Sequence, residues 1–127
     1  AFSVRKKVKF WDYVDDKKKF ELLARAHVLI NPSVREGWGL VNIEANALET
    51  PVVAYNVPGC RDSVKNGYSG ILCREKTPSC LADEAIGLLR NKSKYKKLSK
   101  NAVFWSNKFD WKTSTQKSLR LIESISL

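Results

Sequence analysis

Two glutamates and a glycine-containing loop are the residues of this sequence best suited to chemistry. The run Glu36-Gly37-Trp38-Gly39-Leu40 follows a short apolar segment and leads directly into a segment with helical periodicity. The first N–H groups of a helix are unpaired and carry partial positive charge, and glycine lets a bulky anion approach the backbone. The run also lies at the expected carboxyl end of a parallel strand, where open α/β sheets bind ligands. These features predict a phosphate-binding site.

Glu36 and Glu44 stand eight residues apart, with Glu36 in the loop and Glu44 beyond the first helical turn. From these positions both carboxylates can point at one ligand docked on the helix end, and carboxylates are strong acceptors for sugar hydroxyls. An acidic residue near a helix start can instead serve only to complement the helix dipole, and for Glu36 alone this interpretation is equally good. It does not explain Glu44, because an unpaired carboxylate among apolar neighbours is costly to bury.

The apolar pattern around this loop predicts an α/β fold. Continuous apolar runs that end at turn residues indicate strands buried on both faces, and i, i+3, i+4 spacing indicates helices. Strand and helix alternate through residue 90, which favours right-handed β-α-β units, and only helices are expected beyond it. We expect strands at 4–10, 28–30, 51–55 and 69–73, and helices at 17–26, 37–49, 61–65 and in three segments after Pro78.

Helical spacing also predicts which side chains each helix turns inward. Asp15 and Asp16 suit the N-cap and first turn of the first helix. The apolar residues expected on inward faces are Phe20, Leu23 and Ala24; Leu40, Ile43, Ala47 and Leu48; Ala82, Ala85, Ile86 and Leu89; Tyr95, Leu98, Ala102 and Trp105; and Leu119, Ile122 and Ile125.

Length and composition limit the class of protein. The 127 residues are enough for one small domain, and a chain that is 43% hydrophobic and 28% charged is typical of globular proteins. No apolar run approaches the roughly 20 residues of a membrane-spanning helix, and the first residues lack the apolar stretch of a signal peptide. There is no methionine, and a strand is expected without a preceding turn or cap, so we interpret the chain as a fragment of a longer protein.

Positive charge is concentrated in the C-terminal part of the chain. Residues 90–127 carry 10 basic and 2 acidic groups, against 13 and 11 in residues 1–89. Segment 92–109 places aromatic residues at helical spacing beneath lysines, so this helix can lie on an anionic membrane surface as a peripheral contact. We favour the alternative, in which the aromatic stripe packs on the sheet and the lysines are solvated. No nucleic-acid-binding motif is found, so no nucleic-acid partner is expected.

Cysteine, histidine and metal chemistry is not expected. Cys60, Cys73 and Cys80 lack the paired C-x2-C spacing of a zinc site, so free thiols and no metal are the simplest interpretation. His27 is the only histidine, and it stands between a helix and a buried strand. A packed or capping side chain is more common there than a catalytic one, so no Ser-His-Asp or Cys-His arrangement is predicted.

Several of these segments together resemble a known enzyme family. They are similar to the donor-binding half of the group 1 (family four) retaining glycosyltransferases of GT-B fold, closely over about residues 8–73 and loosely over the tail. The matching segments are Pro32-Ser33, Glu36-Gly37-Trp38-Gly39-Leu40, Glu44-Ala45, Pro51-Val52-Val53-Ala54 and Gly67-x-x-Gly70-x-Leu72. The resemblance implies a Rossmann-like parallel sheet with flanking helices and a helical tail from about residue 91. Residues 1–127 would then form part of a C-terminal nucleotide-sugar-binding domain, without the N-terminal acceptor domain.

The resemblance also implies roles for individual residues. Glu36 would be the catalytic residue and would contact the donor sugar. The donor diphosphate would be bound by Gly37, Trp38, Gly39 and Leu40, and the ribose by Glu44. Tyr13 and Val14 would lie by the base. The family usually needs no bound metal for the diphosphate, so no metal or cofactor is implied, and the donor would be a UDP- or GDP-sugar.

The sequence departs from the family pattern in two places, and parts of the family's site are absent. Asp12 stands where glycine is common, and Arg61-Asp62 replace a frequent acidic position. The family's phosphate-binding Arg/Lys pair and two central strands belong to an upstream segment. In the strand order 3-2-1-4-5-6, the strand at Val8 would therefore lack its neighbours. We expect it to pair within a rearranged sheet or to present its edge to another chain.

These inferences predict part of a glycosyltransferase that moves a hexose from a nucleoside diphosphate sugar to an acceptor with retention. The expected location is cytoplasmic, including the membrane surface. We expect the 127 residues alone to be inactive and to self-associate, through the strand at Val8 and through tail aromatics such as Trp111 that would meet the missing N-terminal domain. The alternative is a non-catalytic nucleotide or nucleotide-sugar binding module. The sequence does not identify the base, the sugar or the acceptor.

Overall fold

A parallel three-stranded sheet forms the centre of the fold. The computed structural model describes residues 6–125. Its strands are β1 (Leu29–Asn31), β2 (Val52–Tyr55) and β3 (Gly70–Cys73), in the order β1-β2-β3. Leu29 pairs with Val52 and Val52 pairs with Gly70, and both strand pairs are parallel. All four residues of β2 are buried, as expected for a strand covered on both faces. Strands are confirmed at all three predicted segments, 28–30, 51–55 and 69–73, but β1 is not buried on both faces as expected, because Ile30 is 46% exposed.

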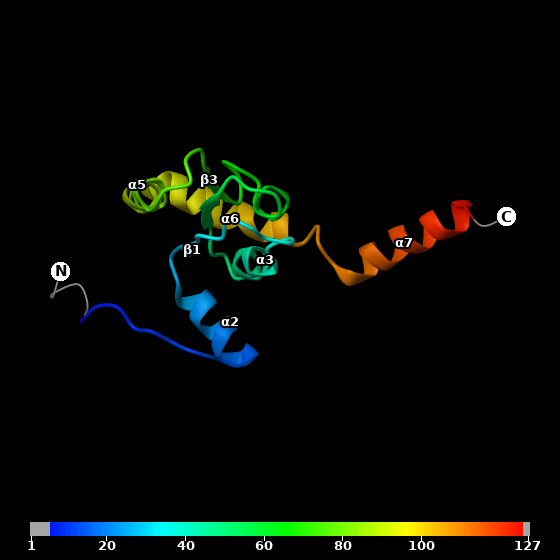
Figure 1. Cartoon of the computed structure of the whole chain (residues 1–127), viewed down its shortest axis with the longest axis horizontal. Helices are drawn as coiled ribbons and strands as arrows, with labels where there is room; N and C mark the ends of the chain where they lie inside the picture. Colours follow the sequence, from blue (N-terminus) through cyan, green and yellow to red (C-terminus); the bar gives the residue numbers. More distant parts are fainter. Residues whose placement is uncertain (1–5, 126–127) are drawn as a thin grey trace.

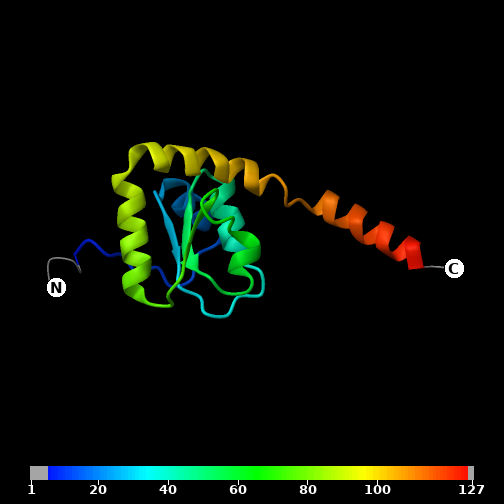
Figure 2. The same cartoon turned by 90° about the horizontal axis from the view of Figure 1, so that it is seen from above.

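Helices cover both faces of this sheet (Figure 1 and Figure 2). The helices described within residues 6–125 are α2 (Asp16–Arg25), α3 (Leu40–Ala47), α4 (Cys60–Ser63), α5 (Pro78–Arg90), α6 (Lys92–Ser106) and α7 (Trp111–Ile125), of which α7 lies away from the sheet. α5 packs against β2 and β3, and α3 packs on the opposite face against β1 and β2. α6 runs across from α5 to α3 and contacts both, while α2 packs beside α3. The predicted α/β layers are therefore confirmed.

Side-chain caps determine where two of the helices begin. Asp15 accepts a hydrogen bond from the amide of Lys18 at 2.8 Å at the start of α2, as the sequence predicted. Thr77 accepts one from the amide of Cys80 at 3.2 Å at the start of α5, with proline in the first turn. Each cap satisfies an N–H group that the helix leaves unpaired and is worth about 1 kcal/mol.

The inward faces of the helices differ in part from the prediction. In α6 the prediction holds, because Leu98 and Ala102 are buried and Tyr95 and Trp105 are half-buried. Residues expected to face inward but exposed in the structure are Phe20, Ala24, Leu40, Ala47, Ala82, Ile86, Leu89, Leu119, Ile122 and Ile125. The buried residues of α3 and α5 are Asn42, Ile43, Ala45 and Asn46, and Leu81, Ala85 and Leu88. Apolar residues occur on more than one side of these two helices, so spacing alone did not select the inward side.

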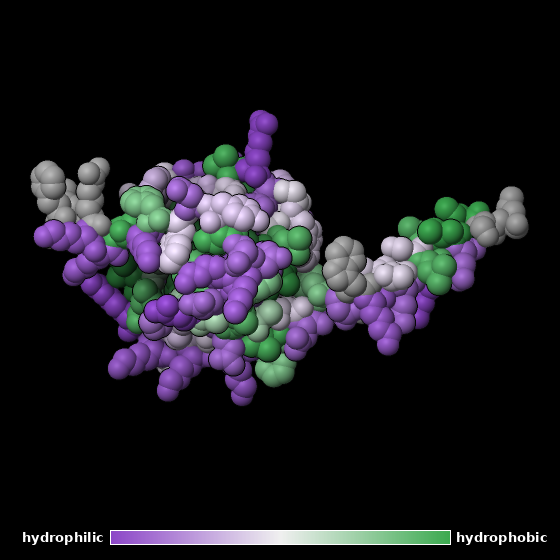
Figure 3. Space-filling model, turned by 90° about the horizontal axis from the view of Figure 1, so that it is seen from below, coloured by the Kyte–Doolittle hydropathy of each residue, from purple (hydrophilic) through white to green (hydrophobic). Residues whose placement is uncertain are grey.

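The helix α7 extends away from the sheet and exposes an apolar side (Figure 1 and Figure 3). Leu119, Ile122 and Ile125 are 53%, 59% and 75% exposed, and Figure 3 shows apolar residues along one side of this helix and hydrophilic residues along the other. The side chain of Trp111 lies outside the described part, and self-association stays a prediction. None of the helices within residues 6–125 has the length and apolar character that crossing a membrane requires.

The strand expected at 4–10 is not formed by its described residues. Residues 6–10 are turn and coil, and Phe10 is 88% exposed; Val4 and Arg5 lie outside the described range. A strand needs a neighbour to complete its backbone hydrogen bonds. Within residues 6–125 β1 pairs only with β2, so residues 6–10 have no partner there. The strand prediction is wrong for these residues, and so is the rearranged pairing or free strand edge inferred from it.

Candidate functional site

The loop of residues 32–39 joins the carboxyl end of β1 to the start of α3. Gly39 is the N-cap of α3 and has φ +80°, a left-handed conformation that favours glycine. Within the described part of the chain no side chain caps α3, and Leu40 at its start is 63% exposed. The Asn42 amide donates to the Gly39 carbonyl at 3.0 Å, and the preceding amides of this helix have no side-chain cap among the described residues. The N-terminus of the helix carries partial positive charge, which favours an anion there.

A buried polar network lies beneath this loop. Asn31, at the end of β1, donates from Nδ2 to Oδ1 of Asn42 in α3 at 3.0 Å. Asn42 Nδ2 donates to Oγ of Ser63 in α4 at 3.0 Å, and Ser63 donates to the carbonyl of Gly59 at 2.9 Å. These side chains are at most 6% exposed, so the bonds between them replace lost contacts with water. Sequence reasoning missed the network, and the available signal was the two asparagines among the apolar residues of α3.

The loop that follows β2 touches the loop that follows β1. Gly59 has φ +88°, and a Cβ atom at this position would overlap the carbonyl oxygen of Glu36. Ser33 donates its amide hydrogen to Asn31 Oδ1 at 3.1 Å, which fixes the start of the first loop. Burial raises the pKa of the Cys60 thiol, and the nearby charge of Glu36 raises it further. Glu36 is half-buried, and its backbone lies close to Gly59 at the start of α4.

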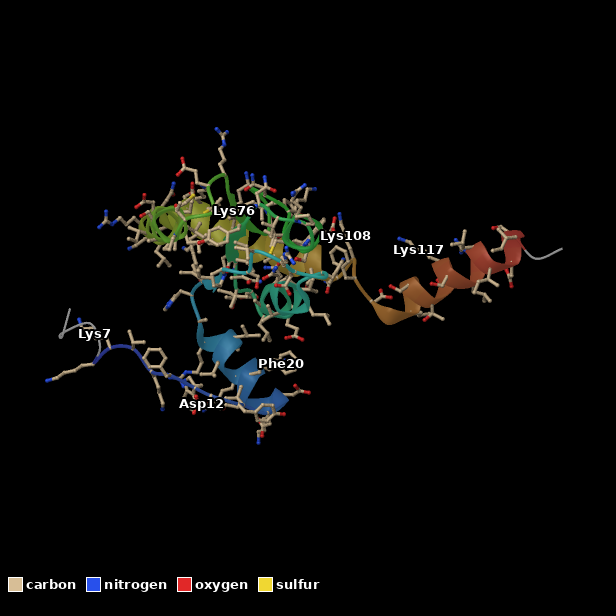
Figure 4. The ribbon with its side chains drawn as sticks, in the orientation of Figure 1. Lys7, Asp12, Phe20, Lys76, Lys108 and Lys117 are labelled. Carbon is tan, nitrogen blue, oxygen red and sulfur yellow. The ribbon has the colours of Figure 1, made fainter. Side chains whose placement is uncertain are left out.

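Aromatic packing holds the middle of the loop. Trp38 lies edge-to-face against Phe109 with ring centroids 5.0 Å apart, and Phe109 packs in the same way on Trp105 at 5.0 Å. Trp105 Nε1 donates to the carbonyl of Ser63 at 2.9 Å, which links α6 to α4. Lys108, labelled at the end of α6 in Figure 4, has its ammonium 5.5 Å from the Trp105 ring. The Trp38 side chain thus serves packing, and its backbone amide is the group left for a ligand.

Glu44 is turned toward α2. The Lys19 ammonium lies 3.1 Å from Glu44 Oε2 and donates to Oε1 at 3.3 Å. Glu44 lines a groove of about 560 Å³ with Phe20, Phe109 and other residues of α3 and the end of α6, but Glu36 does not. Figure 4 shows the Phe20 side chain on α2, on the side toward α3. The expectation that both glutamates face one cleft stays a prediction.

The two residues predicted to lie by the base precede α2. Tyr13 is 92% exposed and Val14 is half-buried, and neither lines the groove beside Glu44. Asp12, labelled in Figure 4, belongs to the same extended segment. The structure therefore places Glu36 against the start of α4 and Glu44 beside α2. The side chain of Tyr13 is exposed to solvent. The role of this segment toward a base stays a prediction.

The three cysteines and the histidine, which the sequence also offered as candidate groups, are described by their burial and their contacts. Cys60, Cys73 and Cys80 are free, and burial together with the neighbouring Cys80 raises the pKa of Cys73 to about 12. His27 is exposed, and its carbonyl, not its imidazole, accepts a hydrogen bond from Tyr95 Oη at 2.7 Å. Among residues 6–125 no three His, Cys, Asp or Glu side chains gather closely enough to hold a metal ion.

The sheet and helices define the class of fold. The chain matches sucrose-phosphate synthase from Thermosynechococcus elongatus with a TM-score of 0.84 and 26% identity, over 98% of this chain and 32% of that one. It matches HepE from Anabaena, in complex with UDP, with a TM-score of 0.74 and 25% identity, over 83% and 29% of the two chains. The fold is thus the Rossmann-like α/β arrangement of GT-B glycosyltransferases.

Sequence comparison identifies the family. The model for glycosyl transferases group 1 matches residues 1–104. An uncharacterized glycosyltransferase from Methanocaldococcus jannaschii is 31% identical over 114 residues, which are 87% of this chain and 32% of that protein. The chain belongs to the group 1 glycosyltransferase family. It spans about a third of the length of these relatives.

Proposed function

We propose that this chain supplies the donor-binding part of a retaining glycosyltransferase, which moves a hexose from a nucleoside diphosphate sugar to an acceptor. The observation that carries the proposal is the 32–39 loop. It leads from the carboxyl end of β1 to the N-terminus of α3, which no side chain of the described residues caps. Glu36 lies in this loop, and Glu44 lies in α3. The similarity to HepE, whose structure holds UDP, supports a ligand of the same class.

Each group has a task that follows from its position. The amides of 37–40 stabilise the departing diphosphate, where negative charge develops during transfer. Glu36 contacts the donor sugar, which passes through an oxocarbenium-like state in retaining transfer. Glu44 accepts hydrogen bonds from the ribose hydroxyls, and Tyr13 and Val14 lie by the base. The acceptor is held by a part of the enzyme outside these 127 residues.

Binding of UDP or GDP to the 127-residue chain tests this proposal. We expect weak binding, because the helix end is present while the family's basic phosphate ligands belong to an upstream segment. One charged hydrogen-bonded partner is worth roughly 1.5–3 kcal/mol, or ~10- to 150-fold in affinity. The measurement is a titration followed by amide NMR shifts at residues 37–40. Unchanged amide shifts at millimolar nucleotide would refute the proposal. A submicromolar dissociation constant would contradict the expectation that the 127 residues hold only part of the phosphate ligands.

Separate substitution of the two glutamates tests their assignment. Glu44→Ala is expected to weaken binding of UDP and of UDP-glucose alike, by ~10-fold or more, because a charged acceptor of the ribose is lost. Glu36→Ala is expected to weaken UDP-glucose while leaving UDP nearly unchanged, since UDP lacks the sugar.

Calorimetry or NMR titration with both ligands measures the difference. Glu75→Ala is the control, because Glu75 is an exposed carboxylate in the loop between β3 and α5, and it should change neither affinity. Equal loss of UDP affinity in the two site variants would show that the assignment is wrong.

A further inference from the structure

A single lysine of α2 holds the carboxylate that is assigned to the ribose. The Lys19 ammonium donates to Glu44 Oε1 at 3.3 Å and lies 3.1 Å from Glu44 Oε2, a buried oxygen that receives no hydrogen bond from the described residues. The side chains are 34% and 21% exposed, and they join α2 to α3 across 25 residues of sequence. No family motif quoted above includes Lys19.

Lys19 makes two further contacts. Its ammonium lies 5.0 Å from the centroid of the Phe20 ring, and Phe20 lines the groove. Its ammonium lies 3.5 Å from Asp16 Oδ1, one turn earlier in α2, and Asp16 is 89% exposed. An ammonium has three donors; here it donates to Glu44 Oε1, while Glu44 Oε2 and Asp16 Oδ1 lie within ion-pair distance. The pKa of Lys19 is raised, chiefly by its hydrogen bond to Glu44, so the ammonium stays charged. Because its hydrogen bond and its shortest ion-pair contact are both to Glu44, Lys19 acts on a ligand through Glu44.

The neighbouring lysine provides the contrast. Lys18 pairs with Glu21 at 3.3 Å within α2, between side chains that are 33% and 47% exposed. Such an i,i+3 pair on one helix is an ordinary surface ion pair with little effect elsewhere. Lys19 instead connects two helices and fixes the orientation of a side chain that lines the 560 Å³ groove.

We propose that Lys19 is a positioning residue for ribose selectivity: it holds the Glu44 carboxylate in the orientation that accepts the vicinal ribose hydroxyls. This role rests on the proposed function of the site. A carboxylate has about four lone-pair directions, so the ammonium occupies some of them and leaves others for a diol. Without Lys19 the carboxylate can rotate freely, and it no longer meets both hydroxyls at once.

The test compares ribonucleotide and deoxyribonucleotide binding by the 127-residue chain. NMR titrations use UDP against 2′-deoxy-UDP and GDP against 2′-deoxy-GDP. The unsubstituted chain is expected to prefer the ribonucleotide by ~10-fold, the size of a charge-assisted hydrogen bond. In Lys19→Met this preference is expected to fall to less than ~3-fold, with deoxynucleotide affinity unchanged. Lys19→Arg should restore most of the preference, and Lys18→Met should keep all of it.

Each outcome decides between distinct explanations. If Lys19→Met keeps the ribose preference, Lys19 does not position Glu44. If Lys19→Met weakens binding of the ribonucleotide and the deoxyribonucleotide equally, the substitution acts through the overall charge or the fold, and the proposal is overturned. Amide spectra that superimpose on those of the unsubstituted chain, except in α2 and α3, establish that the variant is folded. If the unsubstituted chain binds none of the four nucleotides, the proposed function itself fails, and this role fails with it.

Discussion

Gly59→Ala is expected to lower the free energy of unfolding by at least about 3 kcal/mol. Two causes act together at this position. The φ of +88° is strained for alanine, and the new Cβ would overlap the backbone carbonyl of Glu36, with the carbonyl carbon only 2.8 Å away. Backbone cannot move aside as the end of a flexible side chain can, so the 32–39 loop must shift. Urea unfolding followed by circular dichroism measures the loss.

Two other glycines separate these causes. Gly67 has φ +78°, but within residues 6–125 no atom other than those of Gly67 and its chain neighbours lies within 4 Å of the place that an added Cβ would take. Gly67→Ala should therefore cost only the conformational strain, about 1–2 kcal/mol. Gly87 lies in α5 with free space and no positive φ, so Gly87→Ala should stabilise the chain by about 0.5–1 kcal/mol. If Gly59→Ala costs no more than Gly67→Ala, the two loops are not in the close contact described.

Local patterns were sufficient to predict the elements that carry the site. The apolar runs at 28–30, 51–55 and 69–73 end at turn residues and form strands. Asp15 caps α2, and the helix expected at 37–49 is α3, which begins at Leu40, directly after the glycine-containing loop. These features depend on neighbours in sequence, which is why single-sequence reasoning finds them.

Features that depend on distant neighbours were not predicted. The apolar pattern pointed Leu40 and Ala47 inward, but α3 turns Asn42 and Asn46 to the core. Asn46 Nδ2 donates to the carbonyls of Thr50 at 3.0 Å and Ser69 at 3.1 Å, partners that only the fold supplies. A buried polar group is tolerable when such partners exist, and helical spacing does not show them.

The error in the first predicted strand and the failure to predict the Lys19–Glu44 pair have the same cause, since both features depend on neighbours that are distant in sequence. Alternating apolar residues near Val8 favour a strand locally, yet in the described chain no neighbouring strand is placed to pair with residues 6–10. Lys19 stood in a run of three lysines and had no local sign of importance. Its partner is fixed by the packing of α2 on α3.

Asn42→Ala is expected to destabilise the chain by about 2–4 kcal/mol and to loosen the 32–39 loop. The substitution removes the acceptor of Asn31 Nδ2 and the donor to Ser63 Oγ, and it leaves both of these buried groups without that partner. Because Asn31 ends β1 and Ser63 lies in α4, the elements on both sides of the 32–39 loop lose their connection. Urea unfolding measures the energy, and amide hydrogen exchange at 37–40 measures the loosening.

A double-mutant cycle with Ser63→Ala shows whether the residues act as one network. A coupling of about 1 kcal/mol is expected, because both single variants remove the same hydrogen bond. Asn66→Ala is the matched control: Asn66 accepts from the amide of Leu72 at 3.0 Å at an exposed site, and its loss should cost less than about 1 kcal/mol. Faster exchange at 37–40 in Asn42→Ala but not in Asn66→Ala would locate the effect at the loop. Zero coupling, or equal exchange in the two variants, would mean that the buried asparagine contributes only to packing.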